Sequence, residues 1–185
     1  MTPKSGTHDI GPSNGQLTVN TYVGGMGSKM GHDLVLQASR WSGTLNLDPD
    51  NPSASSVQVT IDPRSLEVIQ ASGGVKALSD KDKREIAQNQ EKTLQVDRFP
   101  EITFESTSVN GSAPRLSVDG NLTIVGNTRP VTLDVEVDDA GANSKVTAKT
   151  TIVQTDFGVK PYSKLGALKV KDPVDLQIVL TLPST

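Results

Sequence analysis

The sequence contains no cysteine and only two histidines, His8 and His32. Without cysteine the chain cannot form a disulfide, a thiolate nucleophile or a cysteine-ligated zinc or iron–sulfur site. With only two histidines, a histidine-rich metal site is not expected either. We therefore predict that the protein binds no metal and uses no cofactor.

Aromatic residues are scarce as well, at 3% of the chain, and the net charge is −3. Proteins that stack bases or flavins normally carry more aromatic rings, and nucleic-acid binding requires a positive surface field. The composition therefore argues against a nucleic-acid partner. No run approaches the roughly 18 apolar residues that a membrane-spanning helix requires, so we expect no membrane span.

The first fifteen residues, MTPKSGTHDIGPSNG, contain one lysine and one large aliphatic residue. A signal peptide would need a basic start followed by an apolar segment, and neither is present. We expect residues 1–15 to form a flexible N-terminal tail and residues 16–185 to form one domain. On the same grounds we expect a cytoplasmic protein.

Alternation of apolar and polar residues dominates the rest of the chain. The clearest instances are SVQVTID, EITFEST, PVTLDVEVD and DLQIVLTL. A period of two is typical of a strand with one buried face, and about nine segments follow it. One wet face per strand favours antiparallel pairing, which predicts an all-β protein. The pattern by itself leaves a sandwich and a closed barrel open.

In DLVLQASRWSGTLNL the apolar positions change from even numbers (Leu34, Leu36) to odd numbers (Trp41, Leu45). Such a change would move the apolar side chains to the opposite face of the strand, unless an extra residue or a bend lies between the two parts. We therefore predict a bulge or turn near Ser39–Arg40.

The segment SDKDKREIAQNQEKTL is the one credible helix. Ser79 stands at the N-cap position and Asp82 follows three residues later, which is a capping-box pattern. Its apolar content is thin, with Ile86 as the main anchor. The helix is therefore expected on the surface or across an opening.

The segment VGGMGSKMGHDL is rich in glycine and carries Met26, Lys29, Met30 and His32. It is not a Walker loop, because Lys29 follows a serine and precedes a methionine, and it lacks the dinucleotide-binding spacing. Met26 and Met30 would share one face of a helical turn, which suits either the rim of an apolar cavity or ordinary core packing. His32 and Asp33 would point to opposite faces of a strand and cannot address one substrate together, which favours a structural histidine.

The segment DFGVKPYSKLGALKVKD concentrates lysines without the other motifs of a kinase. It is either a solvated loop or a basic rim that meets an anionic head group. The residues predicted for this head-group role are Lys160, Lys164 and Lys169.

Several segments together resemble the YceI-like family in order and spacing: KMGHDLVLQASRWSGTLNLDP, VTIDPRSLEV, DRFPEITFEST, GNLTIVGNTRPVTLDVEV and QTDFGVKPYSKLGALKVKDPVDLQIVL. The resemblance covers nearly the whole domain and is closest to a branch without signal peptides. It implies a single antiparallel, eight-stranded, lipocalin-like barrel with one short helix, whose interior holds a polyisoprenoid or similar lipid. The inward residues of KVTAKTTIV are mostly small, which would leave room for such a ligand.

We therefore expect non-enzymatic binding, carriage or sequestration of a long apolar lipid. The alternatives are an enzyme that modifies an isoprenoid lipid, with His32 as its one candidate acid or base, and an assembly module with a filled barrel. A homodimer remains open. The predicted ligand-binding residues are Met26, Met30, Leu34, Leu36, Trp41, Leu45, Ile102, Phe104, Leu122, Ile124, Leu133, Val135, Ile152, Phe157, Tyr162, Leu165, Ile178 and Leu180.

Overall fold

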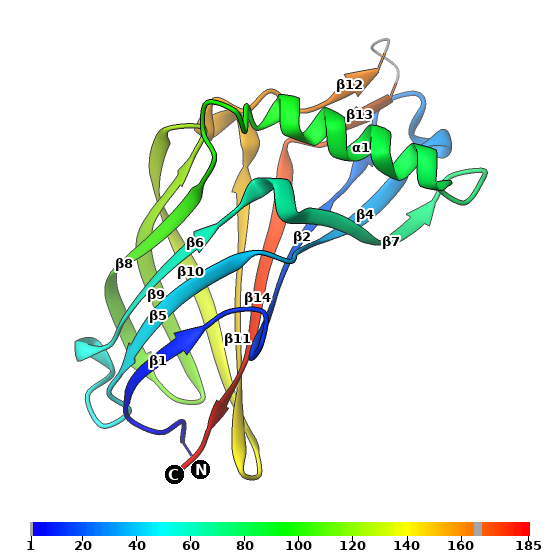
Figure 1. The fold of residues 1–185 in the computed structure, drawn as a ribbon. Coiled ribbons are helices and arrows are strands. Elements are labelled where there is room, and N and C mark those ends of the chain that lie inside the picture. Colours follow the sequence, from blue (N-terminus) through cyan, green and yellow to red (C-terminus); the bar gives the residue numbers. More distant parts are fainter. Residues whose placement is uncertain (1, 165–167) are drawn as a thin grey trace.

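The computed structural model describes residues 2–164 and 168–185, which form one antiparallel sheet, a small second sheet and one α-helix (Figure 1). The strands of the main sheet are, in chain order, β1 (Gly6–Ile10), β2 (Gly15–Thr21), β4 (His32–Ala38), β5 (Trp41–Leu47), β6 (Ser56–Ile61), β7 (Leu66–Gly73), β8 (Ile102–Ser112), β9 (Arg115–Ile124), β10 (Asn127–Ala140), β11 (Asn143–Val153) and β14 (Pro173–Pro183). The small sheet contains β3 (Val23–Gly24), β12 (Ser163–Lys164) and β13 (Leu168–Val170), and the helix is α1 (Asp80–Thr93). Short 3₁₀ turns are η1 (Ser28–Met30), η2 (Pro52–Ala54), η3 (Pro63–Ser65) and η4 (Gln154–Phe157).

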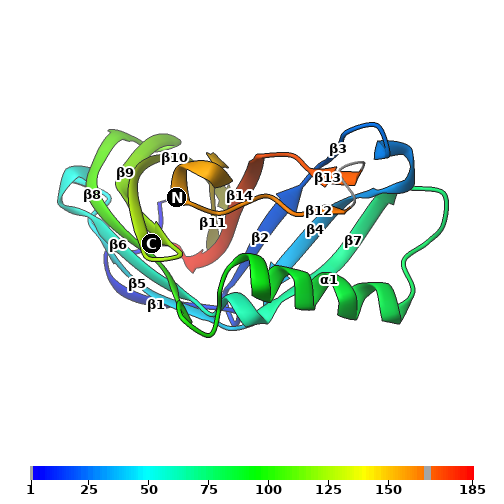
Figure 2. The same ribbon diagram turned by 90° about the horizontal axis from the view of Figure 1, so that it is seen from above.

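The main sheet is strongly curled, and its strands follow the order β1-β5-β6-β8-β9-β10-β11-β14-β2-β4-β7 (Figure 2). The helix α1 and the small sheet lie at one end of this sheet, whereas both chain termini lie at the other end (Figure 1). Because alternate residues of each strand point inward, the dry faces of all the long strands meet along the axis of the curl.

The predicted all-β architecture with one helix is confirmed, but the predicted count of eight strands is wrong. The main sheet has eleven strands within the described residues. Two breaks in one long hairpin account for part of the difference: Ser39–Arg40 separates β4 from β5, and Asp62–Ser65 separates β6 from β7. The two arms remain paired on both sides of the breaks, β5 with β6 and β4 with β7. The predicted turn near Ser39–Arg40 is thereby confirmed.

The remaining additional strand is β1, which lies within the segment 1–15 that was expected to be a tail. It pairs with β5 from Gly6↔Leu47 to Ile10↔Gly43. Only Ile10 of this strand reaches the core, at 3% exposure, so the segment carries almost no alternation from which a strand could be recognised.

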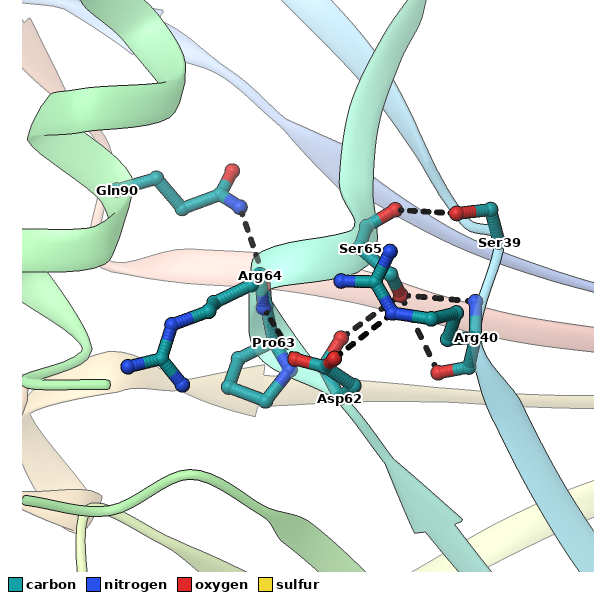
Figure 3. A network of polar contacts seen from close by, with 7 residues as sticks. All are labelled: Ser39, Arg40, Asp62, Pro63, Arg64, Ser65 and Gln90. Atoms are coloured by element: carbon teal, nitrogen blue, oxygen red, sulfur yellow. Dashed lines mark hydrogen bonds and ion pairs between the residues drawn. The ribbon is translucent and has the colours of Figure 1, made fainter. Parts of the chain in front are cut away.

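A polar network holds the bend of the long hairpin (Figure 3). The buried Ser65 hydroxyl donates to the carbonyl oxygen of Asp62 (2.8 Å) and accepts from the amide of Arg40 (3.0 Å). The Asp62 carboxylate accepts from Arg40 Nε and from the amide of Arg64, both at 2.9 Å. Partial burial would raise the pKa of Asp62, but these hydrogen bonds outweigh it and hold the pKa below its ordinary value.

The helix α1 begins as predicted. The Ser79 hydroxyl accepts from the amide of Asp82, and the Asp82 carboxylate accepts from the amide of Ser79, which completes the capping box. Toward its C-terminus, Gln90 donates from Nε2 to the carbonyl oxygen of Pro63 (3.3 Å). The bend of the hairpin therefore also fixes where α1 lies, beside the opening of the curled sheet (Figures 2 and 3).

The core fills the curl at the level of β5. Trp41 is 5% exposed, and its indole packs against the backbone of Gly15. A Cβ at Gly15 would lie 2.9 Å from the Trp41 ring and 2.6 Å from Leu180, so glycine is needed for this close approach. Large apolar residues thus fill this part of the interior.

Candidate functional site: apolar cavities along the sheet axis

The curled sheet encloses a dry cavity of about 190 Å³, called here the inner cavity. Among the described residues that line it, only Thr150 and Gln177 carry polar side chains. Eight of the predicted ligand-binding residues border it: Ile102, Phe104, Leu122, Ile124, Leu133, Val135, Ile178 and Leu180. The alternation in the sequence therefore identified the inward face of β8, β9, β10 and β14 correctly.

Small side chains on β11 keep part of this space open. Val146, Ala148 and Thr150 all border the inner cavity, as the small inward residues of this strand predicted. Ala148 lies opposite Val135 on one side and Ile178 on the other. A larger residue at this position would project into the cavity, because its two cross-strand neighbours already occupy the wall.

A second space, the outer cavity, lies toward α1 and the small sheet and has a volume of about 540 Å³. The walls of the two spaces adjoin at one row of cross-strand neighbours: Leu36 borders the outer cavity, and its neighbours Val19 and then Leu176 border the inner one. Six predicted residues border the outer cavity: Met30, Leu34, Leu36, Tyr162, Lys164 and Lys169.

A third space of about 100 Å³, the lower cavity, lies at the end of the sheet where the chain termini meet. Leu45 borders this space and not the inner cavity. Val118, Val135 and Val146 border both the inner and the lower cavity. The three spaces therefore follow one another along the axis of the sheet.

The structure places the other predicted residues away from these walls. Trp41, Ile152 and Phe157 are buried in the core, at 5%, 6% and 2% exposure, and none of them borders the inner or the outer cavity. Lys160 is exposed and lies outside the outer cavity. Leu165 lies outside the residues that the structure describes.

The two methionines of the glycine-rich segment do not share a face. Met26 is 98% exposed and borders neither cavity, whereas Met30 is 70% exposed and borders the outer one. The helical turn is shorter than expected, because the 3₁₀ turn η1 covers only Ser28–Met30 and Met26 lies outside it. The segment is a connection between β3 and β4 that contributes one methionine to the rim.

His32 and Asp33 have separate structural partners, as their positions on a strand predicted. The Nε2 atom of His32 hydrogen bonds to the carbonyl oxygen of Lys76 (2.7 Å), and the Asp33 carboxylate accepts from the amide of Val23 (2.8 Å). The His32 contact holds the segment after β7 onto β4 and the Asp33 contact holds β3 onto it, so the pair does not form an acid–base dyad.

Charged groups surround the outer cavity. Lys76, Lys164 and Lys169 border it together with Asp82 and Glu85 of α1. Lys164 Nζ lies 3.7 Å from Glu85 Oε1, and both side chains are at least half exposed. Such an exposed pair stabilises the fold by about 0 to 1 kcal/mol, so Lys164 can exchange this carboxylate for another anion.

Sequence analysis missed part of the outer wall. The segment after β7 contributes Val75, Ala77 and Leu78, and α1 contributes Ile86 and Asn89. The sequence offered one signal for this wall: Ile86 is the main apolar residue of α1, which indicates that the face of the helix carrying Ile86 covers an apolar space. Val75 gave no signal, because it stands outside any periodic segment, and it is 73% exposed.

Comparisons with known proteins agree with this architecture. The model of the YceI-like domain matches residues 13–182. Protein YceI of Salmonella arizonae is 33% identical over 130 residues, which cover 64% of this chain and 62% of the relative, and Protein YceI of Salmonella newport matches equally. The chain thus matches somewhat less than two thirds of the length of these curated relatives.

Solved structures show the same fold at lower sequence identity. BcnA of Burkholderia cenocepacia superposes with a TM-score of 0.69 at 21% identity, covering 92% of this chain and 96% of BcnA. The Campylobacter jejuni YceI protein superposes with a TM-score of 0.60 at 17% identity, covering 80% of this chain and 83% of that protein. Within the described residues, no helix has the length and hydropathy to cross a membrane. With its domain model matched from residue 13 to residue 182, this chain belongs to the YceI-like family.

Proposed function

We propose that the protein binds a long apolar lipid, and most favourably a polyisoprenoid, inside the curled sheet, and that it carries or sequesters this lipid without changing it chemically. The observation that carries the proposal is the inner cavity, whose lining offers a ligand almost no hydrogen-bonding group. A polar ligand would lose its hydration there without compensation, whereas an apolar chain would not. Membership in the YceI-like family fits a lipid-binding barrel.

The driving force would be the removal of the tail from water. Burial of roughly 400 Å² of apolar surface at about 25 cal/mol per Å² gives about 10 kcal/mol before costs. Ordering of the flexible chain and loss of its free motion offset much of that gain.

The lysines at the outer cavity would attract a phosphorylated or carboxylated head group. Lys164 and Lys169 stand at this position, together with Lys76, which the sequence did not single out. Lys160, the third residue predicted for this role, does not border the cavity and is left out of the proposal. Because the lysines are near the surface, their attraction would be screened by salt.

The test is uptake from vesicles. The purified protein is incubated with phosphatidylcholine vesicles that contain a prenyl alcohol of four isoprene units, then re-isolated, extracted and analysed by mass spectrometry. We expect stoichiometric uptake of the prenyl alcohol and weaker uptake of a linear alcohol of equal carbon number. Absence of both from the re-isolated protein would refute lipid binding, and sedimentation velocity of the same sample would then test the alternative of a homodimeric assembly module. Conversion of the alcohol to another product would instead show an enzyme.

A further inference from the structure

The inner and the lower cavity share three of their described lining residues, and all three are valines. Val118 of β9, Val135 of β10 and Val146 of β11 border both spaces. Val135 lies opposite Leu116 and Ala148, whereas Val118 lies opposite Leu133 and Val146 opposite Val137. From β9 through β10 to β11, each valine is thus shifted along its strand relative to the valine before it. Inward residues at the same level along the axis of the sheet show this stagger when the strands are tilted.

The geometry points to these three valines as the limit on the length of the lipid tail, an inference that rests on the proposed lipid-binding function. A tail that enters past α1 runs through the outer and inner cavities and meets the valines as a floor. Beyond them lies the lower cavity, of about 100 Å³, whose lining is mainly apolar and includes Thr2, Asp48 and Ser55 as its polar residues. A longer tail would need to displace the valines to reach it.

The length above the floor follows from the strands. The outer cavity extends along β4 from His32 to Leu36, and the inner cavity along β14 from Leu176 to Leu180. Each interval corresponds to about 13 Å of strand, and a tilt of about 40° reduces the sum to roughly 20 Å along the axis. An extended polypeptide advances at most about 3.6 Å over three bonds, so an isoprene unit with four chain bonds spans about 5 Å. The tunnel above the valines therefore accommodates about four units.

The experiment compares tail lengths in competition. Phosphatidylcholine vesicles that contain equal amounts of prenyl alcohols with three, four and nine isoprene units are offered to the protein, and the bound alcohols are quantified by extraction and mass spectrometry. Units that remain outside the tunnel lose the apolar surroundings of the bilayer, so the wild-type protein should prefer three and four units over nine.

The variant that opens the floor is Val118→Ala/Val135→Ala, which removes methyl groups between the two cavities. It should raise the bound ratio of nine-unit to four-unit alcohol by about tenfold, the change that 1.4 kcal/mol of additional burial produces. The control is Val19→Ala/Val131→Ala, which removes the same groups from walls that border the inner cavity but not the lower one. The ratio should stay unchanged in the control. Val118→Ala alone provides the same comparison if the double variant does not fold.

Four outcomes decide the matter. A raised ratio in the floor variant and not in the control supports the length limit. An equal rise in both variants, or a wild-type protein that binds nine units as well as four, overturns the limit and leaves lipid binding in place. Failure of the wild-type protein to take up any of the three alcohols overturns the proposed function itself, and the length limit with it.

Discussion

Filling the inner cavity with protein should stabilise the ligand-free molecule and weaken lipid binding, and Ala148→Leu is the substitution that tests this. Ala148 borders the inner cavity of about 190 Å³ on β11, between Val135 and Ile178. Leucine adds three carbon atoms, whose burial is worth about 0.8 kcal/mol each, or roughly 2.4 kcal/mol in total. The loss of leucine rotamers offsets about 0.5 to 1 kcal/mol. The free energy of unfolding without ligand should therefore rise by about 1 to 2 kcal/mol.

The same three carbon atoms occupy space that the lipid tail would otherwise fill. The loss of about 2.4 kcal/mol of tail burial corresponds to an affinity roughly 50-fold weaker. Urea unfolding gives the first quantity and lipid titration the second. The control is Ala140→Leu, at an exposed position near the end of β10, which should change neither by much. Unaltered affinity in Ala148→Leu would refute the assignment of the tail to the inner cavity, and a loss of stability would show that the space there is not open.

Four further predictions use the same structure. Leu133→Arg should unfold the protein or abolish lipid uptake because it buries an unpaired charge. Thr132→Arg, on the wet face of the same strand, should do neither. Equal stability of the two variants in a urea melt would show that the inward face is misassigned. Affinity for a prenyl phosphate should fall with salt more steeply than affinity for the matching alcohol, and Lys164→Gln should reduce that difference; identical salt curves in the wild type would remove the head-group role. Amide hydrogen exchange around Met30 should slow on lipid binding because the side chain gains an apolar partner at the rim, and unchanged exchange would mark a fixed connection. Asp62→Asn should lower the free energy of unfolding by about 1 to 2 kcal/mol at pH 7, because it weakens the hydrogen bonds that hold the bend. Since the folded pKa of Asp62 is lowered, urea melts at different pH values should show this difference above about pH 5 and lose it as the pH falls below about 4.

The sequence by itself determined which side of each long strand is dry. Alternation is a local property with a period of two, and it needs no knowledge of the neighbouring strand, so Phe104, Leu133 and Ile178 were assigned to the interior correctly. The start of α1 was equally predictable, because the capping box between Ser79 and Asp82 closes within four residues. The change of phase before Trp41 likewise predicted the break in the long hairpin.

The tertiary structure alone decided how these dry faces meet. Alternation does not say which distant strand lies opposite, so it could not separate Leu133, which borders a cavity, from Ile152, which fills the core. The strand β1 was missed because its pairing with β5 is non-local and only Ile10 reaches the core. Met26 and Met30 differ because the turn η1 covers only Ser28–Met30 and leaves Met26 outside it, and composition does not specify the length of that turn. Which inward residues border each of the three spaces depends on how the strands pair, a property of the whole sheet and of no single segment.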